Sequence, residues 1–433
     1  MAAPALGRSR DEFRNALAGR LTHVSSSETI CIVGTGLAGG SAAPALREAR
    51  FMGRVILVGA EGELPYDRPP LSKAYLTGKM PLEKLWLRPS AYYQQHAIEL
   101  RTGLAVSLDP KSRRLEISDG GSISYDQLLI ATGSAARELT VAGSRLEGVL
   151  TVRSLQDADR LRTRLEPRPR VLVVGAGFLG CELAASARSL GCEVQVVEVG
   201  AAPMAVMGEH VSRFVAELHL SHGVPIECTT SVAEFRGQDK LEAVVLGDGR
   251  LVPCELALVC VGASPRLDLA SGAGLAADGG IPIDTSCRSS DPSIFAAGDV
   301  AAMWHPNLGR RLRLEHWDNA VRQGQHAAKA MLGDPSPFEA IPYFWSEQYD
   351  AMLQQVGLPE AASELVLRGR PGETRFSVFG LSGGLVVSCV AINQFRDLSA
   401  ARRMIGSGQP VAASSLADPG VELRALVDAL PRA

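Results

Sequence analysis

Two glycine-rich segments carry residue types that bind nucleotide phosphates. The first is Gly34-Thr35-Gly36-Leu37-Ala38-Gly39, the second is Gly175-Ala176-Gly177-Phe178-Leu179-Gly180, and each follows an apolar run. In a G-x-G-x-x-G pattern the first glycine permits a tight turn, the second lets the backbone approach a pyrophosphate, and the third lets helix and strand pack closely. The helix expected after each loop offers free N–H groups and its positive dipole end to phosphates. Two such sites in one chain predict that an electron donor and an electron acceptor are bound together.

An acidic residue follows each loop where one is needed to bind ribose hydroxyls. Glu61 ends the run after the first loop and Glu198 ends the run after the second, each at a spacing of about 20 residues. One G-x-G-x-x-G alone is a weak signal in this chain, because 44 of its 433 residues are glycine. The succession of strand, loop, helix and acid favours nucleotide binding over a purely structural turn.

The elements that position these loops alternate between strand-like and helix-like runs. A strand, a helix and a strand are predicted over 29–58, followed by a long proline-containing loop over 61–73 that is predicted to be irregular. Further strands are predicted at 104–108, 113–118, 122–131, 171–174, 193–198, 242–247, 256–261 and 291–299, and further helices from 178, near 208–222 and over 315–332. Beyond 333–335, strands at 351–356, 363–368, 374–379 and 385–391 precede helices at 397–406 and 420–430. This order predicts an α/β fold with two Rossmann-like nucleotide-binding domains and a C-terminal α+β domain.

Composition argues against several classes of protein. The formal net charge of −3 gives no electrostatic case for nucleic-acid binding. No apolar run reaches the roughly 18 residues of a membrane span. None of the eight cysteines forms a C-x-x-C and no His/Cys cluster has zinc spacing, so no metal site is predicted. Free thiols without an export signal indicate a protein of the reducing cytoplasm.

The first 26 residues differ from the rest of the chain. They carry four arginines but also Asp11 and Glu12, and they lack the apolar core of a secretory signal. We expect a flexible extension there, with a short helix over 11–21 and an organelle transit peptide as weaker alternatives.

Six strings resemble those of one enzyme family and occur in that family's order over about residues 29 to 425. The strings are the two glycine loops, Pro65-Tyr66-Asp67-Arg68-Pro69-Pro70-Leu71-Ser72-Lys73, Ala131-Thr132-Gly133, Phe295-Ala296-Ala297-Gly298-Asp299 and Tyr343-Phe344-Trp345-Ser346-Glu347-Gln348-Tyr349. With them the chain resembles the oxygenase-coupled ferredoxin reductases, which are NADH- and FAD-dependent flavoproteins of the rubredoxin and putidaredoxin reductase type. These enzymes are more remotely related to apoptosis-inducing factor. The P-Y-x-R-P-P-L-S-K and F-W-S-x-Q-Y strings are much more specific than the glycine loops.

The resemblance implies three domains after the extension at 1–26. An FAD-binding domain, 27–145 and 267–335, is split around an NAD-binding domain at 146–266, and a C-terminal α+β interface domain covers 336–433.

The resemblance also implies which residues hold each nucleotide. Those implied for FAD are Gly34, Gly36, Leu37, Ala38, Gly39, Glu61, Arg68, Lys73, Thr132, Gly133, Arg137, Gly298, Asp299, Glu315, His316, Trp317 and Trp345. Those implied for NAD are Gly175, Gly177, Phe178, Leu179, Gly180, Glu182, Glu198, Val261 and Gly262.

Three residues are expected to act on the reaction itself. In the family, the glutamate that matches Glu182 pairs with the lysine that matches Lys73 near flavin N5, and Trp345 is expected near the far face of the ring. Glu182 lies two residues after Gly180 and is expected on the first helical turn, facing the nicotinamide. The alternatives are a solvated loop lysine, an exposed helix glutamate and a core tryptophan.

The implied path runs from NADH to FAD and then, as single electrons, to an external [2Fe–2S] ferredoxin. Glu198 favours NADH over NADPH because it accepts the ribose 2′-hydroxyl and repels a 2′-phosphate, and 199–207 contains no arginine to offset it. Arg310, Arg311 and Arg313 are a basic segment that could steer an acidic ferredoxin, or could equally be a solvated loop. The oligomeric state is expected to be monomer or homodimer.

Other activities share this fold. A disulfide oxidoreductase needs a redox cysteine pair soon after the first loop, and the absence of any cysteine between Cys31 and Cys181 excludes it. An NADH oxidase or a monodehydroascorbate-type reductase is the closer alternative. A redox-responsive interaction protein like apoptosis-inducing factor is a third, weakly favoured by the arginines of the extension. The sequence does not identify the ferredoxin, the oxygenase or its organic substrate.

Overall fold

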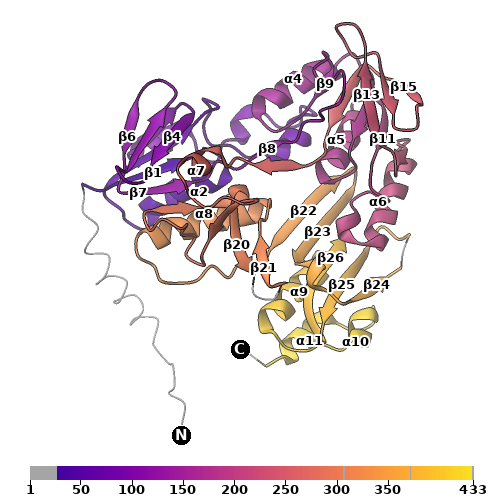
Figure 1. Ribbon diagram of the computed structural model, residues 1–433. Coiled ribbons are helices and arrows are strands. Elements are labelled where there is room, and N and C mark those ends of the chain that lie inside the picture. Colours follow the sequence, from indigo (N-terminus) through magenta and orange to yellow (C-terminus); the bar gives the residue numbers. More distant parts are fainter. Residues whose placement is uncertain (1–26, 306–307, 371, 432–433) are drawn as a thin grey trace. The chain divides into compact units, whose positions relative to one another are not determined.

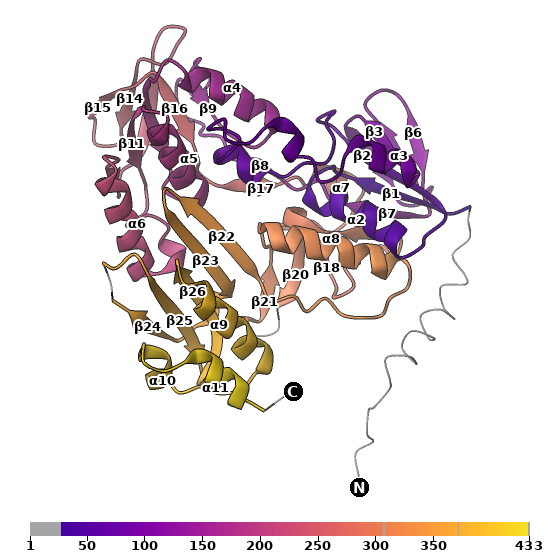
Figure 2. The same cartoon turned by 180° about the vertical axis from the view of Figure 1, so that it is seen from behind.

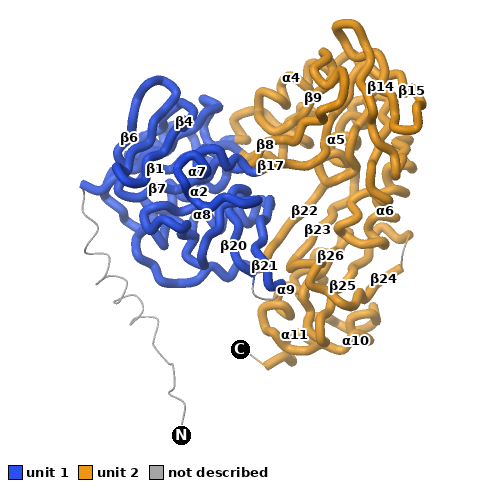
Figure 3. The backbone as a smooth tube through the Cα atoms, viewed as in Figure 1, with its two compact units in different colours: residues 1–66, 86–133, 265–340 blue, residues 67–85, 134–264, 341–433 orange. Residues whose placement is uncertain are grey.

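A computed structural model describes residues 27–305, 308–370 and 372–431, which form two compact units (Figure 3). The first unit includes residues up to 66, 86–133 and 265–340, and the second includes 67–85, 134–264 and 341–433. The chain therefore passes between the units five times. The predicted helix at 11–21, with the rest of the extension, lies outside the described residues.

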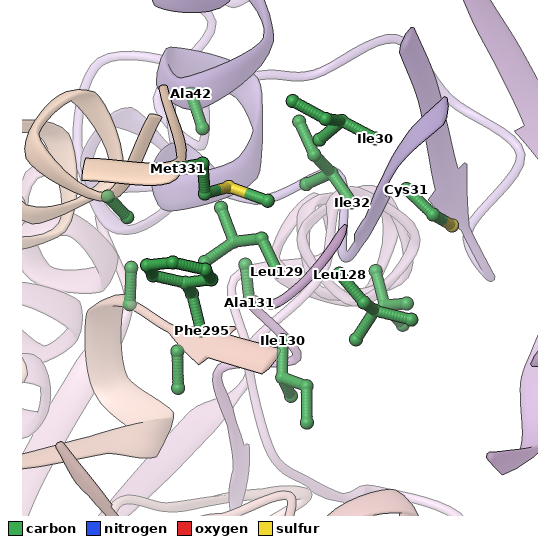
Figure 4. Close-up of a cluster of buried hydrophobic side chains, with 14 of the residues drawn as sticks. Ile30, Cys31, Ile32, Ala42, Leu128, Leu129, Ile130, Ala131, Phe295 and Met331 are labelled. Carbon is green, nitrogen blue, oxygen red and sulfur yellow. The ribbon is translucent and has the colours of Figure 1, made fainter. Parts of the chain in front are cut away.

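A five-stranded parallel sheet in the order β19–β7–β1–β2–β3 is the centre of the first unit (Figure 1). The strands are β1 (Thr29–Val33), β2 (Arg54–Gly59), β3 (Ile98–Thr102), β7 (Gln127–Ile130) and β19 (Ile294–Ala296). Its central strands are continuous apolar runs, as expected of parallel strands covered on both faces. Side chains of β1, β7 and β19 interdigitate with Ala42 and Met331 in the core (Figure 4).

Two helices of the first unit, α2 (Leu37–Glu48) and α8 (Trp317–Met331), lie side by side in both views (Figures 1 and 2). A Cβ atom at Gly324 would lie 2.2 Å from the carbonyl oxygen of Ala38, so only glycine permits this close approach. A small second sheet consists of three antiparallel strands, β4 (Ala105–Asp109), β5 (Arg114–Ile117) and β6 (Ser122–Ser124). The remaining elements are α3 (Ser90–Gln95), α7 (Asp268–Gly272), β18 (Ile281–Ile283), η5 (Gly298–Val300), β20 (Ala301–His305) and β21 (Arg310–Leu312).

A second parallel sheet, in the order β12–β11–β10–β16–β9, lies in the second unit. Its strands are β9 (Val149–Leu150), β10 (Arg170–Val174), β11 (Glu193–Val197), β12 (Ile226–Glu227) and β16 (Leu256–Val259). The helices beside it are α4 (Leu155–Leu165), α5 (Phe178–Ser189) and α6 (Glu209–Ser221). The smaller elements of this unit are η2 (Pro69–Ser72), η3 (Leu82–Lys84), β8 (Ser134–Ala136), η4 (Ala205–Met207), β13 (Val232–Arg236), β14 (Ala243–Leu246), β15 (Leu251–Pro253) and β17 (Ala263–Pro265).

An antiparallel sheet in the order β22–β23–β26–β25–β24 completes the second unit. Its elements are β22 (Tyr343–Gln348), β23 (Ala351–Gly357), η7 (Pro359–Ala361), β24 (Glu364–Gly369), β25 (Phe376–Ser382), β26 (Leu385–Ile392), α9 (Phe395–Ser407), α10 (Ala413–Ala417) and α11 (Leu423–Ala429). This sheet shares a hydrophobic core with the parallel sheet, in which Phe376 packs edge-on against Phe214 of α6. The α/β class, the duplicated nucleotide-binding unit and the C-terminal α+β segment are confirmed. The predicted domain boundaries stay a prediction.

Several local expectations were wrong. The loop at 61–73 is not wholly irregular, because η2 forms at Pro69–Ser72, where prolines fit a first helical turn. Glu182 is the fifth residue of α5 and opens its second turn rather than its first. No strand was expected at 343–348 and no helix at 155–165, where β22 and α4 form.

No helix among the described residues is long and apolar enough to cross a membrane. No cluster of His, Cys, Asp and Glu in that part of the chain could hold a metal ion. The eight cysteines are free thiols, six of them buried, and burial raises the pKa of Cys31 and Cys254 to about 12.

Candidate functional site

The three glycines of the first loop have different surroundings. Gly34 has a φ of +120°, and a Cβ there would lie 2.1 Å from the carbonyl oxygen of Ala131, the residue that follows the neighbouring strand β7. A Cβ at Gly39 would lie 1.9 Å from the Gly34 carbonyl oxygen, so helix α2 presses against the loop. At Gly36 nothing lies within 4 Å, and no side chain caps the helix that starts there. The loop thus leaves one face open beside an uncapped helix N-terminus, which fits a pyrophosphate.

The second loop repeats this pattern residue by residue. A Cβ at Gly175 would lie 2.4 Å from the Cys260 carbonyl oxygen, and one at Gly180 would lie 1.9 Å from the Gly175 carbonyl oxygen. Gly177 is exposed, has nothing within 4 Å of an added Cβ, and caps α5 without a side-chain bond. Two nucleotides can therefore be held in the same manner, one in each unit.

The acidic residues after the second strands differ in their partners. The Glu198 carboxylate accepts hydrogen bonds from the backbone N–H of Ala176, at 2.6 Å, and of Gly200, at 2.7 Å. Glu61 is exposed, and its carboxylate accepts a hydrogen bond from the hydroxyl of the buried Tyr66. Each carboxylate is thus oriented in its own unit at the carboxyl edge of a parallel sheet, where ribose hydroxyls bind in this fold.

Asp299 is held close to the helix of the first loop. It follows Gly298, whose φ is +80° and whose added Cβ would lie 3.0 Å from the Ala38 side chain. The Gly298 N–H donates to the Gln323 side chain at 2.8 Å, and the Arg313 guanidinium donates to the Asp299 carbonyl oxygen at 3.2 Å. These contacts place Gly298 and Asp299 beside the N-terminus of α2.

Lys73 and Glu182 form a largely buried ion pair. The Lys73 ammonium donates to Oε2 of Glu182 at 2.8 Å, and the two side chains are 15% and 8% exposed. The hydroxyl of Ser72 donates to the same oxygen at 2.7 Å, and that of Ser346 donates to Oε1 at 2.8 Å. The expected pairing is confirmed, and the alternatives of a solvated lysine and an exposed glutamate are wrong. Three donors therefore fix the Glu182 carboxylate as an oriented anion.

The tryptophan of the C-terminal string lies on β22, whose side chains alternate between two faces. Trp345 shares one face with Tyr343, and their rings stack with centroids 6.0 Å apart. Phe344 and Ser346 share the other face, and the Phe344 ring contacts that of Phe178 with centroids 4.2 Å apart. Trp345 therefore points away from Glu182, and its expected role at a flavin stays a prediction.

The loop before Lys73 is anchored by an arginine. The Arg68 guanidinium donates to the carbonyl oxygen of Arg153 at 2.7 Å, in the segment that leads to α4. Both ends of the P-P-L-S string are thus tied to the second unit, Arg68 at one end and Lys73 at the other.

The remaining expected site residues fall in two groups. In the first unit, Thr132 donates to the Arg266 carbonyl oxygen at 2.9 Å, and His316 precedes α8, which Trp317 opens. Glu315, implied for FAD, pairs with Arg313. In the second unit, the Arg137 side chain bonds Ser264 at 3.2 Å and lies against Gly262. The Gly133 carbonyl oxygen accepts from the Arg266 N–H at 2.9 Å. The partly buried side chains that pack against hydrophobic cores are Leu37, Leu179 and Val261.

Sequence reasoning missed four polar residues of the site. Ser72, Ser346 and Gln348 lay in the two specific strings but had no assigned role, and His219 lay in a predicted helix. A signal for the burial of His219 was present, because it follows Val215 by four residues and Val211 by eight and so shares their apolar helix face.

Comparisons with known proteins match the whole described architecture. Residues 28–324 match the family described as pyridine nucleotide-disulphide oxidoreductase, and 343–427 match the family described as reductase C-terminal. The ferredoxin–NAD(+) reductase component of the anthranilate 1,2-dioxygenase system of Burkholderia cepacia is 39% identical, with 92% of this chain and 99% of the relative covered.

Two solved structures are similar over nearly the whole chain. The ferredoxin reductase for the CYP199A2 system of Rhodopseudomonas palustris has a TM-score of 0.90 and 36% identity, covering 93% of this chain and 100% of that one. The covalent putidaredoxin reductase–putidaredoxin complex matches with a TM-score of 0.90 and 34% identity, covering 94% and 99%. These matches agree with the two glycine loops and the buried Lys73–Glu182 pair. The chain therefore belongs to the pyridine nucleotide-disulphide oxidoreductase family, among the ferredoxin reductases of oxygenase systems.

Proposed function

We propose that this protein is an FAD-dependent NADH:ferredoxin oxidoreductase that supplies electrons to an oxygenase. The observation that carries the proposal is the pair of uncapped glycine loops, one in each unit, combined with the buried Lys73–Glu182 pair. FAD, when bound, supplies the chemistry that converts a two-electron hydride donor into a source of single electrons. The family's use of FAD and NAD(H) supports both cofactors.

The first loop, with Glu61 and Asp299, is proposed to hold FAD. Gly36 leaves open space at the helix N-terminus for a pyrophosphate, and Gly298 brings Asp299 up to the same helix. The other FAD residues implied by the family resemblance, including Thr132, His316 and Trp345, are part of this proposal. So are an FAD domain split around the NAD domain and a C-terminal interface domain.

The second loop, with Glu198, is proposed to hold NADH. The Glu198 carboxylate is already oriented by the backbone N–H groups of Ala176 and Gly200, with both oxygens engaged. A ribose 2′-hydroxyl can donate to such a carboxylate, whereas a 2′-phosphate would be repelled. Comparable oxidation of NADPH and NADH by the purified protein would contradict this assignment.

The electron acceptor is proposed to be a [2Fe–2S] ferredoxin. Support comes from the relatives whose names contain ferredoxin reductase and from the solved complex of one relative with putidaredoxin. On this protein's own surface, Arg310 and Arg311 are exposed on β21, and Arg311 pairs in register with Trp304, which is 52% exposed. Exposed arginine and tryptophan together are typical of interface anchors.

Cofactor binding and reduction give the first test of this function. Purified protein should be yellow and should lose that colour on anaerobic addition of NADH. A colourless protein that gains no colour when FAD is added would contradict the proposal. We also propose a cytoplasmic location, supported by free thiols, with a monomer or homodimer as the working assembly.

A further inference from the structure

A chain of buried polar side chains leads away from Glu182 on the side opposite Lys73. It runs through Ser346 and Gln348 of β22 to His219 of α6, and all three residues are 0% exposed. Burying three polar side chains is costly unless each finds hydrogen-bond partners. The three do so with one another, and the chain ends on the Glu182 carboxylate.

The carboxylate sets the direction of every hydrogen bond in this chain. An ionised glutamate only accepts, so the Ser346 hydroxyl donates to Oε1 of Glu182 at 2.8 Å. The Ser346 oxygen then accepts from Nε2 of Gln348 at 3.2 Å. This turns Oε1 of Gln348 toward His219, whose Nε2–H donates to it at 3.0 Å.

The environment of His219 keeps its ring in the form that this chain needs. Burial lowers the pKa of His219 to about 4, so the ring is neutral and carries one proton. With that proton on Nε2, Nδ1 is the acceptor and faces the Tyr349 hydroxyl at 3.4 Å. His222, a nearby ionisable residue, stacks on Tyr349 with ring centroids 3.7 Å apart. It is not a member of the hydrogen-bond chain from His219 to Glu182.

We propose that His219 is a positioning residue, which acts through Gln348 and Ser346 to orient the Glu182 carboxylate against Lys73. Its role differs from simple core packing, because every bond from His219 to Glu182 donates toward the carboxylate. Such an aligned chain holds the carboxylate in one orientation. The inference rests on the proposed function, in which the Glu182–Lys73 pair acts on the reaction of NADH.

The test compares His219 of α6 with His222, the C-cap residue of the same helix, in the FAD-loaded protein. His219→Phe removes the donor, whereas His222→Phe leaves the chain intact and is the matched control. We expect His219→Phe to lower kcat for NADH-dependent ferricyanide reduction by about tenfold with little change in KM, because misplaced reacting groups slow chemistry more than binding. Gln348→Met, which keeps the length of the side chain, should give the same result if His219→Phe does not fold.

Two further measurements separate positioning from packing. On a Ser346→Ala background, which already disconnects Glu182, His219→Phe should cause no further loss of kcat. By NMR of isotope-labelled histidine, the His219 ring should remain in its Nε2–H form in wild-type protein and should change when Glu182→Gln is introduced. The NMR measurement does not depend on turnover.

The outcomes are distinguishable from failure of the proposed function. If wild-type protein does not oxidise NADH, the proposed function fails whatever the variants do. If wild-type protein is active but His219→Phe and Gln348→Met are no slower than His222→Phe, or if the losses with Ser346→Ala are additive, the positioning role is overturned. An unchanged His219 signal in Glu182→Gln would also overturn it.

Discussion

Lys73 donates a 2.8 Å hydrogen bond to Glu182, although 109 residues separate them along the chain. The fold brings a loop lysine and a helix glutamate together within the second unit, where both side chains are largely shielded from water. Ser72 and Ser346 complete the partners of the carboxylate. A charged pair that is this fully coordinated predicts a large effect on stability when one partner is removed.

Removal of the lysine should destabilise the fold. Lys73→Met leaves the Glu182 carboxylate with two hydroxyl donors and no counter-charge, and breaking a buried pair in this way costs about 3 kcal/mol. Arg213→Met, which breaks the exposed Glu209–Arg213 pair, is the control and should cost less than about 1 kcal/mol. Urea unfolding measures the free energy of unfolding of both variants. Equal losses would show that breaking the Lys73–Glu182 pair costs no more than breaking an exposed pair.

The second glycine loop predicts different effects for alanine substitutions at two of its glycines. Gly177→Ala places a methyl group in open space with an ordinary φ of −75°, so the fold should survive while the KM for NADH rises by at least about tenfold. Gly180→Ala forces a methyl group to within 1.9 Å of the Gly175 carbonyl oxygen, so it should lower the melting temperature. Unchanged NADH affinity in Gly177→Ala would contradict phosphate binding at this loop.

Stability should fall in mild acid because of His219. Burial lowers the pKa of His219 from 6.5 to about 4, so between these values the unfolded chain binds a proton that the folded chain does not. The stabilising contribution is complete above pH 6.5 and is lost as the pH falls toward 4, by about 3 kcal/mol in total. Urea unfolding at several pH values should show a shallower acid loss in His219→Gln than in wild-type protein. Identical slopes would mean that His219 does not govern this loss.

The strand β21 predicts a selective effect on the partner reaction. Arg310→Glu combined with Arg311→Glu should slow ferredoxin reduction, most strongly at low ionic strength, and leave NADH-dependent ferricyanide reduction unchanged. Arg114→Glu on β5, another exposed arginine, which pairs with Glu116, is the control. A parallel loss of ferredoxin and ferricyanide reduction would place these arginines in the enzyme's own reaction rather than at a docking surface.

Much of the fold could be predicted because its signals are local. The apolar run before Gly34, the glycine spacing and the acid at Glu61 all lie within one strand–helix–strand unit, and β1, α2 and β2 form there. The signals from Gly175 to Glu198 are likewise local to one strand–helix–strand unit. The last four C-terminal strands, β23 to β26, also followed from short apolar runs bounded by turns, whereas β22 did not.

The hydrogen-bond chain could not be predicted because it depends on contacts between distant segments. Ser346 and Gln348 reach the site only because β22 lies against α5 and α6, and nothing near them in sequence specifies that packing. The Lys73–Glu182 pair was expected only from a family resemblance, not from local pattern. Helix α4 was missed although its capping box at Ser154 and Asp157 is a readable start signal.

The central claim is that electrons from NADH leave this protein through a ferredoxin. The most direct measurement is cytochrome c reduction by the FAD-loaded protein with NADH, in the presence and absence of a [2Fe–2S] ferredoxin encoded beside its gene. The account predicts fast reduction that requires the ferredoxin, little reduction with NADPH, and little oxygen consumption when the ferredoxin is left out. Rapid oxygen consumption without any carrier, or no stimulation by the ferredoxin, would contradict it.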